Sequence, residues 1–254
     1  MQQENRGVAI GVVSDMLRRV QAKQPLYSLE AEFVPQPLAA ARRLGLPDTW
    51  LRKFEAANPN QRQVLSIVRL VGGSPAVGKL KQGDILLSID DKVLTKFREV
   101  ELAVADKPEV NVMVWRDGEE KLVTLATAAL TGLDIDRIVM WAGATLQAPH
   151  RAMIAQRGIP PEGVYVGYFA YGSPSTRYGL FPGRRITEVD GIPTPNLDAF
   201  LKVVSGRPDR SAIRLRTITW NNAPEVITLK LDRHYWPTYE LKRTDTGWVR
   251  QDLE

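Results

Sequence analysis

The side chains best suited to covalent chemistry in this sequence are two histidines and the serines of two Gly-Ser-Pro turns. A histidine can serve as general base for a serine nucleophile when a carboxylate orients it. Ser74 and Ser173 are each followed by proline, which has no backbone amide to donate to an oxyanion. We therefore predict no catalytic role for these serines or for His150 and His234, and no proteolysis by this chain.

The sequence also lacks the residue patterns of known metal-binding and phosphate-binding sites. The sequence has no cysteine, its two histidines are far apart, and no acidic run has the spacing of a calcium loop, so we expect no metal site and no cofactor. Gly72-Gly73 is not followed by the Gly-Lys-Ser/Thr of a phosphate-binding loop. The pair Asp90-Asp91 has its counterpart in Asp190-Gly191, which is typical of a turn after a strand.

Composition indicates an ordinary globular chain long enough for two domains. It has 254 residues, 44% hydrophobic and 25% charged, and a net charge of +5 that is spread along the sequence. A nucleic-acid-binding protein more often concentrates its basic residues in one stripe, so we expect no nucleic-acid partner. No apolar run approaches the ~18 residues of a membrane span, and the first residues do not read as an export signal.

An internal repeat accounts for most of the chain. The Gly-Ser-Pro turns begin at residues 73 and 172, and from residues 83 and 183 onward the two copies keep a constant offset of 100 over residues 83–104 and 183–204. Strands are predicted at 64–70 and 164–169, and Asp117-Gly118 predicts a hairpin. Apolar residues three, four and seven apart predict helices over 97–104 and 197–204, the second starting at either Asn196 or Thr194-Pro195. Shorter helical segments precede each copy, and the fold class is β-rich α+β.

The order of these motifs resembles a known family. The pattern "GSP…L..GD.I..ID" followed by an amphipathic helix is similar to a PDZ domain of the permuted HtrA type, and "WAGATLQAPHRA" with "NLDAFLKVV" and "RHYWPTYEL" resembles the C-terminal tandem PDZ region of HtrA-like serine proteases, of the fungal nuclear pro-apoptotic type and its bacterial relatives. The resemblance implies two tandem PDZ-like, partly open β-barrels, each with two helices. The family's Gly-Asn-Ser-Gly-Gly nucleophile turn is absent.

The resemblance also implies domain boundaries. Residues 1–24 would be a remnant of the protease domain, its last strand and a linker helix that begins at Ser14. PDZ-like domains would follow at 25–130 and 131–233, and 234–254 would form a C-terminal tail.

A PDZ-like fold implies a groove where a peptide adds as a strand and loop amides bind its C-terminal carboxylate. In the second repeat the resemblance places the loop at Ala142, Gly143 and Ala144, the strand edge at Thr145, Leu146 and Gln147, and the facing helix at Leu197, Phe200, Leu201 and Val204. In the first repeat the matching loop is Glu30-Ala31-Glu32. The missing glycine and the acidic residues predict that the first repeat has lost peptide capture and become a packing or docking domain.

Two functions from different classes follow from the resemblance. The first is a non-catalytic module for protein quality control that binds peptides or unfolded protein C-termini and regulates a trypsin-like protease domain in cis or in trans. The second is a structural or oligomerisation module, possible as a homo-oligomer, whose grooves are closed by neighbouring segments such as the tail "HYWPTYELKRTDTGWV"; an independent envelope adaptor is a further alternative. The family includes nuclear proteins and proteins of the bacterial periplasm or envelope, so the compartment stays unknown.

Overall fold

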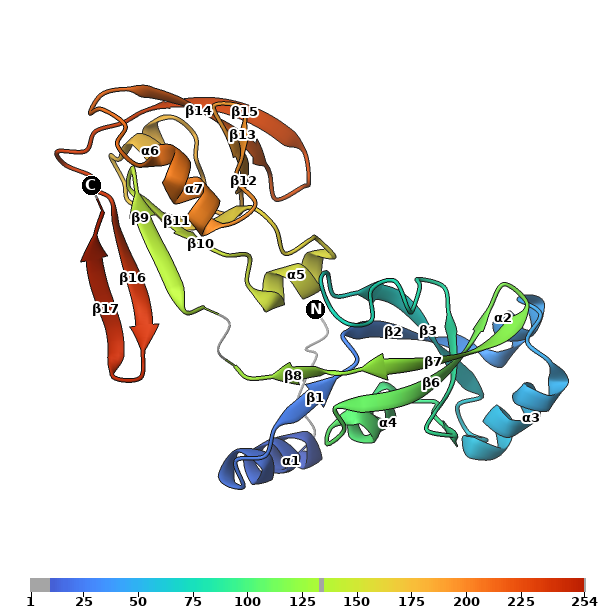
Figure 1. Ribbon diagram of the computed structural model, residues 1–254. Helices are drawn as coiled ribbons and strands as arrows, with labels where there is room; N and C mark the ends of the chain where they lie inside the picture. Colours follow the sequence, from blue (N-terminus) through green and yellow to red (C-terminus); the bar gives the residue numbers. More distant parts are fainter. Residues whose placement is uncertain (1–9, 133–134, 254) are drawn as a thin grey trace, which may run out of the picture. The chain divides into compact units, whose positions relative to one another are not determined.

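The computed structural model describes residues 10–132 and 135–253, and these form two compact units that meet in sequence at residue 132. Each unit has its own sheet and its own buried apolar core. The β-rich α+β class is confirmed, and both sheets are open rather than closed into barrels (Figure 1). Among the described residues, no helix is long and apolar enough to cross a membrane.

The first unit is built on a sheet with the strand order β2-β3-β4-β6-β7, with β5 beside β4 and a separate pair β1–β8. The strands are β1 (Leu26–Ser28), β2 (Ala31–Pro37), β3 (Gln63–Leu70), β4 (Ile85–Ile89), β5 (Lys92–Val93), β6 (Glu109–Arg116), β7 (Glu119–Ala126) and β8 (Ala128–Leu130). The predicted hairpin joins β6 to β7, because Asp117 and Gly118 both adopt the positive φ that a two-residue turn of this kind requires.

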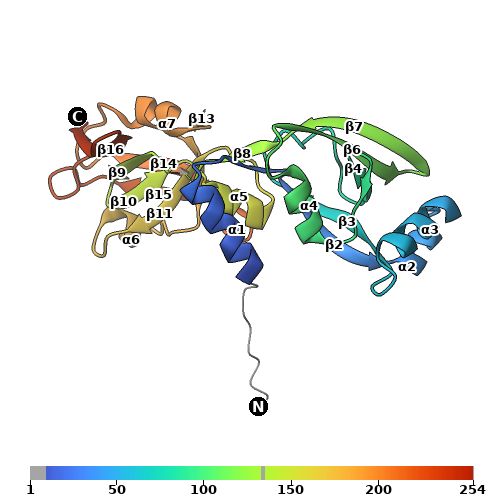
Figure 2. The same ribbon diagram turned by 90° about the horizontal axis from the view of Figure 1, so that it is seen from below.

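Four helices accompany this sheet: α1 (Ile10–Gln21), α2 (Leu38–Arg43), α3 (Asp48–Ala57) and α4 (Phe97–Val104). Helices α2 and α3 lie together at one end of the unit (Figure 2), where Trp50, Leu51 and Phe54 cover a second small core. Helix α3 was not expected from the repeat, because the second copy has no sequence segment that corresponds to Asp48–Ala57.

The second unit is built on a longer sheet with the order β15-β14-β12-β11-β10-β9-β16-β17, with β13 beside β12. Its strands are β9 (Arg137–Trp141), β10 (Ala144–Gln147), β11 (Val164–Phe169), β12 (Arg185–Val189), β13 (Ile192–Pro193), β14 (Ala212–Ile218), β15 (Pro224–Lys230), β16 (Tyr239–Thr244) and β17 (Gly247–Asp252). Its helices are α5 (Arg151–Arg157), α6 (Pro174–Arg177) and α7 (Leu197–Val204). Of the two predicted starts of α7, Asn196 is its N-cap, and the Asn196 side chain accepts the Ala199 amide at 2.9 Å.

Two terminal segments differ from their predictions. Residues 10–13, expected as a strand, are helical, and Ser14 lies inside α1 rather than at its start; residues 1–9 lie outside the described residues. The helical turn places Asp15 and Arg19 four residues apart on one face, where Asp15 pairs with Arg98 and Arg19 pairs with Asp106. The expected tail at 234–254 contains a hairpin, β16–β17, which joins the sheet.

Candidate functional site

The predicted carboxylate loop of the second unit is a tight turn between two paired strands. Ala142 and Gly143 both have positive φ, 51° and 78°, and the flanking residues Trp141 and Ala144 are direct partners in the β9–β10 ladder. Positive φ at two consecutive residues is the geometry of a two-residue hairpin turn. The glycine therefore serves the hairpin.

The expectation that Thr145–Gln147 forms an open strand edge is wrong. Strand β10 pairs with β11 on one side, Gln147 opposite Tyr165, and with β9 on the other, Gln147 opposite Ile138. A strand has two edges, so a third strand cannot add to β10 in this arrangement. In this conformation, β9 occupies the position where the prediction placed a peptide.

The apolar residues predicted to face the peptide belong mainly to the core. Leu197, Phe200 and Val204 are buried, and the Phe200 ring meets Trp141 of β9 edge-on at 5.1 Å between centroids. Leu146 is buried in the same core. Of the four helix residues, Leu201 alone is only partly buried within the core cluster, and it lines a cavity of about 310 Å³ beside the C-terminal hairpin.

The second Gly-Ser-Pro turn packs directly on the hairpin turn. The Ser175 hydroxyl donates to the Ala142 carbonyl oxygen at 2.7 Å, and the Ala170 amide donates to the Gly143 carbonyl oxygen at 2.7 Å. A Cβ at Gly143 would lie 2.1 Å from the Ser173 Cβ and 3.1 Å from the Trp236 ring. The second Gly-Ser-Pro turn thus packs against the turn between β9 and β10.

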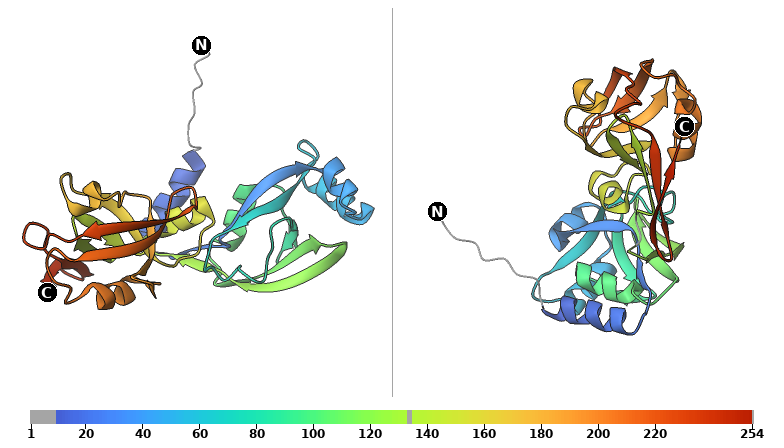
Figure 3. Two further views of the ribbon diagram at one scale, coloured as in Figure 1. Left: turned by 90° about the horizontal axis from the view of Figure 1, so that it is seen from above. Right: turned by 90° about the vertical axis from the view of Figure 1, so that its left-hand side faces the viewer.

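Strand β16 extends the sheet beyond β9, and the two strands run side by side in Figures 1 and 3. Glu240 of β16 is 2% exposed and accepts hydrogen bonds from Arg137 Nε at 2.8 Å and from Lys242 Nζ at 2.6 Å. Arg137 also bonds Asp198 of α7 at 2.5 Å. Burial raises the pKa of Glu240, but the hydrogen bonds from Lys242 and Arg137 outweigh burial and hold this pKa below its ordinary value.

In the first unit the corresponding strand has an open edge. Strand β2 ends the strand order and pairs with β3 alone among the described strands. Its sequence contains Pro35 and Pro37, and proline in a strand is confined to edges and bulges, so the sequence did carry a signal for this edge that the repeat comparison did not use.

The strand register corrects the residue correspondence between the two loops by one position. Ala31 is the partner of Leu70 and Ala144 is the partner of Phe169, at the same place in each copy. Glu30 therefore occupies the position of Gly143, where Ala31 was expected. Glu30 has a φ of 57° and is buried, so this loop keeps the left-handed conformation with an acidic residue in place of glycine.

A groove lies between the β2 edge and α4, around a cavity of about 110 Å³. Its apolar walls include Phe33 of β2 and Phe97 and Val100 of α4, with the two phenylalanine rings 6.4 Å apart. Phe33 is buried, whereas Phe97 is 48% exposed and available for contact. This combination of an unpaired strand edge and an apolar helix face is what strand addition requires.

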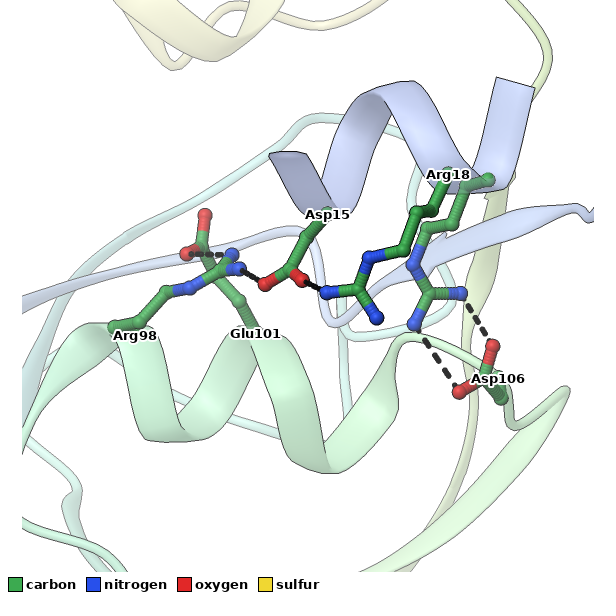
Figure 4. A network of polar contacts seen from close by, with 6 residues as sticks. Asp15, Arg18, Arg98, Glu101 and Asp106 are labelled. Atoms are coloured by element: carbon green, nitrogen blue, oxygen red, sulfur yellow. Dashed lines mark hydrogen bonds and ion pairs between the residues drawn. The ribbon is translucent and has the colours of Figure 1, made fainter. Parts of the chain in front are cut away.

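Helix α1 borders the same groove through charged residues. Asp15 bonds Arg98 of α4, and Arg19 bonds Asp106 just after α4 (Figure 4). The hydrogen bond from Arg19 lowers the pKa of Asp106 below its ordinary value. No described residue of α1 is buried, so these ion pairs, rather than an apolar core, are the main contacts of α1 with the α4 region.

The contacts of the two histidines are with an amide and with aromatic rings. His150 Nδ1 is 3.3 Å from Gln147 Nε2, and its ring meets Tyr165 edge-on. The His234 ring packs on Tyr235. Within residues 10–132 and 135–253, no group of three or more histidine, aspartate or glutamate side chains is placed to hold a metal ion.

Comparison with known proteins places the chain among PDZ-containing sequences. Residues 133–210 match the family model of the PDZ-like domain. The chain is 34% identical over 261 residues to Protease Do-like 7 of Arabidopsis thaliana, covering 93% of this chain and 24% of that protein. It is 36% identical over 245 residues to the Pro-apoptotic serine protease nma111 of Aspergillus oryzae, covering 93% and 24%. A solved structure of the HtrA-type protease AlgW with decapeptide aligns at a TM-score of 0.33 and 15% identity, over 68% of this chain and 56% of that chain.

The residues that match the PDZ-like model hold β9 to β13 and α5 to α7 of the second unit. The resemblance of the whole chain to the PDZ-containing part of HtrA-like serine proteases is confirmed by relatives that align with 93% of it. The chain spans about a quarter of the length of these curated relatives.

Proposed function

We propose that this chain is a non-catalytic tandem PDZ-like module that binds extended peptides or unfolded protein C-termini and regulates an HtrA-like serine protease domain in cis or in trans. The observation that carries the proposal is the unpaired outer edge of β2 beside the apolar face of α4. The names of the relatives, a Do-like protease and a pro-apoptotic serine protease, support the link to proteolysis.

In this proposal the peptide adds to β2 as an antiparallel strand over Ala31 and Phe33, with Phe97 and Val100 contacting its side chains. Main-chain hydrogen bonds supply affinity that depends little on sequence, and the apolar wall selects side chains. Pro35 and Pro37 cannot donate to the ladder, which limits the paired segment to the first residues of β2.

The loop before β2 determines whether the groove favours a peptide with a free C-terminal carboxylate. Glu30 takes the place of the loop glycine and is buried there, so a carboxylate arriving beside it meets a like charge. We therefore expect this groove to bind peptides with a free C-terminal carboxylate and with a C-terminal amide about equally. In the second unit, carboxylate capture by the amides of residues 142–144 stays a prediction, and it requires β9 to leave β10.

Fluorescence polarisation with a labelled apolar peptide tests the groove. We expect a dissociation constant in the micromolar range for the unaltered chain, since ordering the peptide offsets much of the contact energy. Phe97→Lys places a charge on the exposed part of the groove wall and is expected to weaken binding about tenfold or more. The matched control is Leu122→Lys, which adds the same charge on the exposed face of β7. Equal binding by both variants would move the site elsewhere.

The absence of catalysis has its own test. Unfolded casein incubated with the chain is expected to remain intact, because proline follows both Ser74 and Ser173 and the Ser173 hydroxyl accepts the Thr176 amide at 3.4 Å. Cleavage that disappears in a His150→Ala or His234→Ala variant would contradict the proposal; cleavage that persists in both variants would indicate a contaminating protease.

A structural role is the second candidate, and the closed edge of the second unit favours it. Strands β9, β16 and β17 fill the side of the sheet where a peptide was expected. Sedimentation velocity across a concentration series distinguishes the candidates. A mass that rises with concentration, together with no peptide binding, supports an assembly module; a constant monomer mass removes the oligomerisation reading.

A further inference from the structure

The outer edge of β9 is an apolar strand edge that a distant part of the chain covers. Residues Ile138 to Trp141 are all hydrophobic, and an exposed edge of this kind readily pairs with other chains. Strand β16 covers it with four antiparallel pairs, from Tyr239 opposite Met140 to Lys242 opposite Arg137. The covering strand lies almost 100 residues further along the sequence, so the strand that pairs with this edge of β9 is not one of its neighbours in sequence.

Arg137 gives this edge a chemical preference. Glu240 stands opposite Val139, which makes it a diagonal neighbour of Arg137, and its carboxylate bonds Arg137 Nε while being almost completely buried. Arg137 is held in place from the other side by Asp198 of α7. A strand without an acidic residue at this position leaves the half-buried guanidinium with one partner fewer.

The covering hairpin has little core of its own. Every residue of β17 is exposed, and an isolated two-stranded hairpin is marginally stable in water. Its further contacts include the Arg250 guanidinium over the Tyr239 ring, and the Leu253 amide that donates to the Thr238 carbonyl oxygen. The order of the hairpin therefore depends on its pairing with β9.

We propose that the outer edge of β9 is an acceptor site for an extended, antiparallel peptide strand that carries an acidic residue at the position of Glu240, and that β16 is the occupant supplied by the chain itself. This site is separate from the β2 groove of the first unit. The proposal for β9 therefore does not depend on whether peptides bind to β2. The hairpin then controls access to the site, because the peptide binds only when β16 is released.

The test compares two charge reversals in the full chain. Glu240→Lys places a cation beside Arg137 and is expected to release the hairpin, whereas Glu225→Lys makes the same change at the exposed partner of Arg184 on β15 and is the control. Hydrogen exchange is expected to accelerate about 100-fold over residues 239–252 in Glu240→Lys, with residues 212–218 unchanged. The probe is a fluorescent peptide with the sequence of residues 237–253.

We expect this peptide to bind the Glu240→Lys chain in the micromolar range and to bind about tenfold more weakly when the peptide itself carries Glu240→Lys. The wild-type and Glu225→Lys chains should not bind it, because their own hairpins occupy the edge. Unchanged exchange, equal binding to all chains, no preference for the acidic peptide, or self-association of Glu240→Lys without peptide binding would each overturn the proposal.

A second variant covers the case in which Glu240→Lys does not fold. A protease cleavage sequence inserted at Tyr235, whose side chain is 73% exposed, allows the wild-type chain to be cut after folding. The hairpin is then held by non-covalent contacts alone, and excess labelled peptide is expected to exchange into its place. No incorporation of label in the cut protein would contradict the proposal.

Discussion

Replacing Gly143 with alanine tests how tightly the turn between β9 and β10 is packed. The φ of Gly143 is 78°, and an added Cβ would lie 2.1 Å from the Ser173 Cβ and 2.6 Å from its Oγ. Ser173 is fully buried and caps α6, so it cannot move aside as the end of a flexible side chain would. We expect the second unit to lose stability.

Two separate costs set the magnitude. The left-handed conformation costs a non-glycine residue about 1–2 kcal/mol. Inserting an extra methyl group into a packed site costs about 1–3 kcal/mol. The free energy of unfolding of the second unit should therefore fall by about 2–5 kcal/mol. Gly172→Ala is the matched control, because Gly172 has the same φ of 78° but open space within 4 Å.

Hydrogen exchange measured peptide by peptide across a urea series resolves the two units and gives each variant's loss of stability. Gly172→Ala should lower the stability of the second unit by about 1–2 kcal/mol, the conformational cost alone. Equal losses in the two variants would show that the contact with Ser173 and Trp236 relaxes without cost. That result would refute the close packing on which the closed turn depends.

Three further predictions concern ion pairs and the domain boundary. Asp84→Ala should destabilise the first unit by about 3–5 kcal/mol in urea unfolding, because Asp84 is 1% exposed and its loss leaves Arg116 without its carboxylate partner; a loss below about 1 kcal/mol would contradict this. Hydrogen bonds from Lys107 and from the Asn111 amide lower the pKa of Asp90 in the folded chain, so ionised Asp90 stabilises the fold above its unfolded-state pKa. This stabilisation is lost as the pH falls through the lowered folded-state pKa. The difference in unfolding free energy between wild type and Asp90→Asn should therefore shrink over that acid range, and a difference that stays constant with pH would refute the prediction. Limited proteolysis should release fragments near residues 1–130 and 131–254, since each unit has its own core, and resistance there with one cooperative unfolding transition would oppose it.

Local turn chemistry was readable from the sequence because it depends on neighbouring residues. Asp90 and Asp190, paired by the repeat, both adopt positive φ, 44° and 51°, and each Oδ1 accepts a backbone amide at 2.9 Å. Asp117-Gly118 forms the predicted hairpin turn, and Asn196, one of the two expected starts, caps α7. The Asn196 cap satisfies its hydrogen bond within one helical turn, whereas the amides bound by Asp90 and Asp190 come from Asn111 and Arg214, 21 and 24 residues further along the chain. The short motif therefore specifies the turn and the cap, and the fold supplies the distant amide donors.

The apolar faces of the helices could also be predicted from the sequence, but whether each face is buried in the core or exposed beside a groove could not. Phe97 begins α4 and Leu197 begins α7 at the same place in the repeat, yet Phe97 is 48% exposed beside a groove and Leu197 is buried. Phe200 is completely buried against Trp141. A helix stripe shows which face is apolar; what covers that face depends on segments that approach from elsewhere in the chain.

Pro35 and Pro37 mark β2 as an edge strand in the sequence, whereas the closure of the corresponding edge in the second unit was decided by tertiary structure. The run Arg137–Trp141 is compatible with an edge strand or a central strand, and it becomes central because Ala142-Gly143 turns it back onto β10 and β16 arrives from the C-terminal segment. The equivalent segment of the first unit, β1, pairs with β8 instead and leaves β2 open. A strand's own residues set its pleat and its apolar face, whereas its number of neighbours follows from hydrogen bonds to distant segments, which a local pattern does not contain.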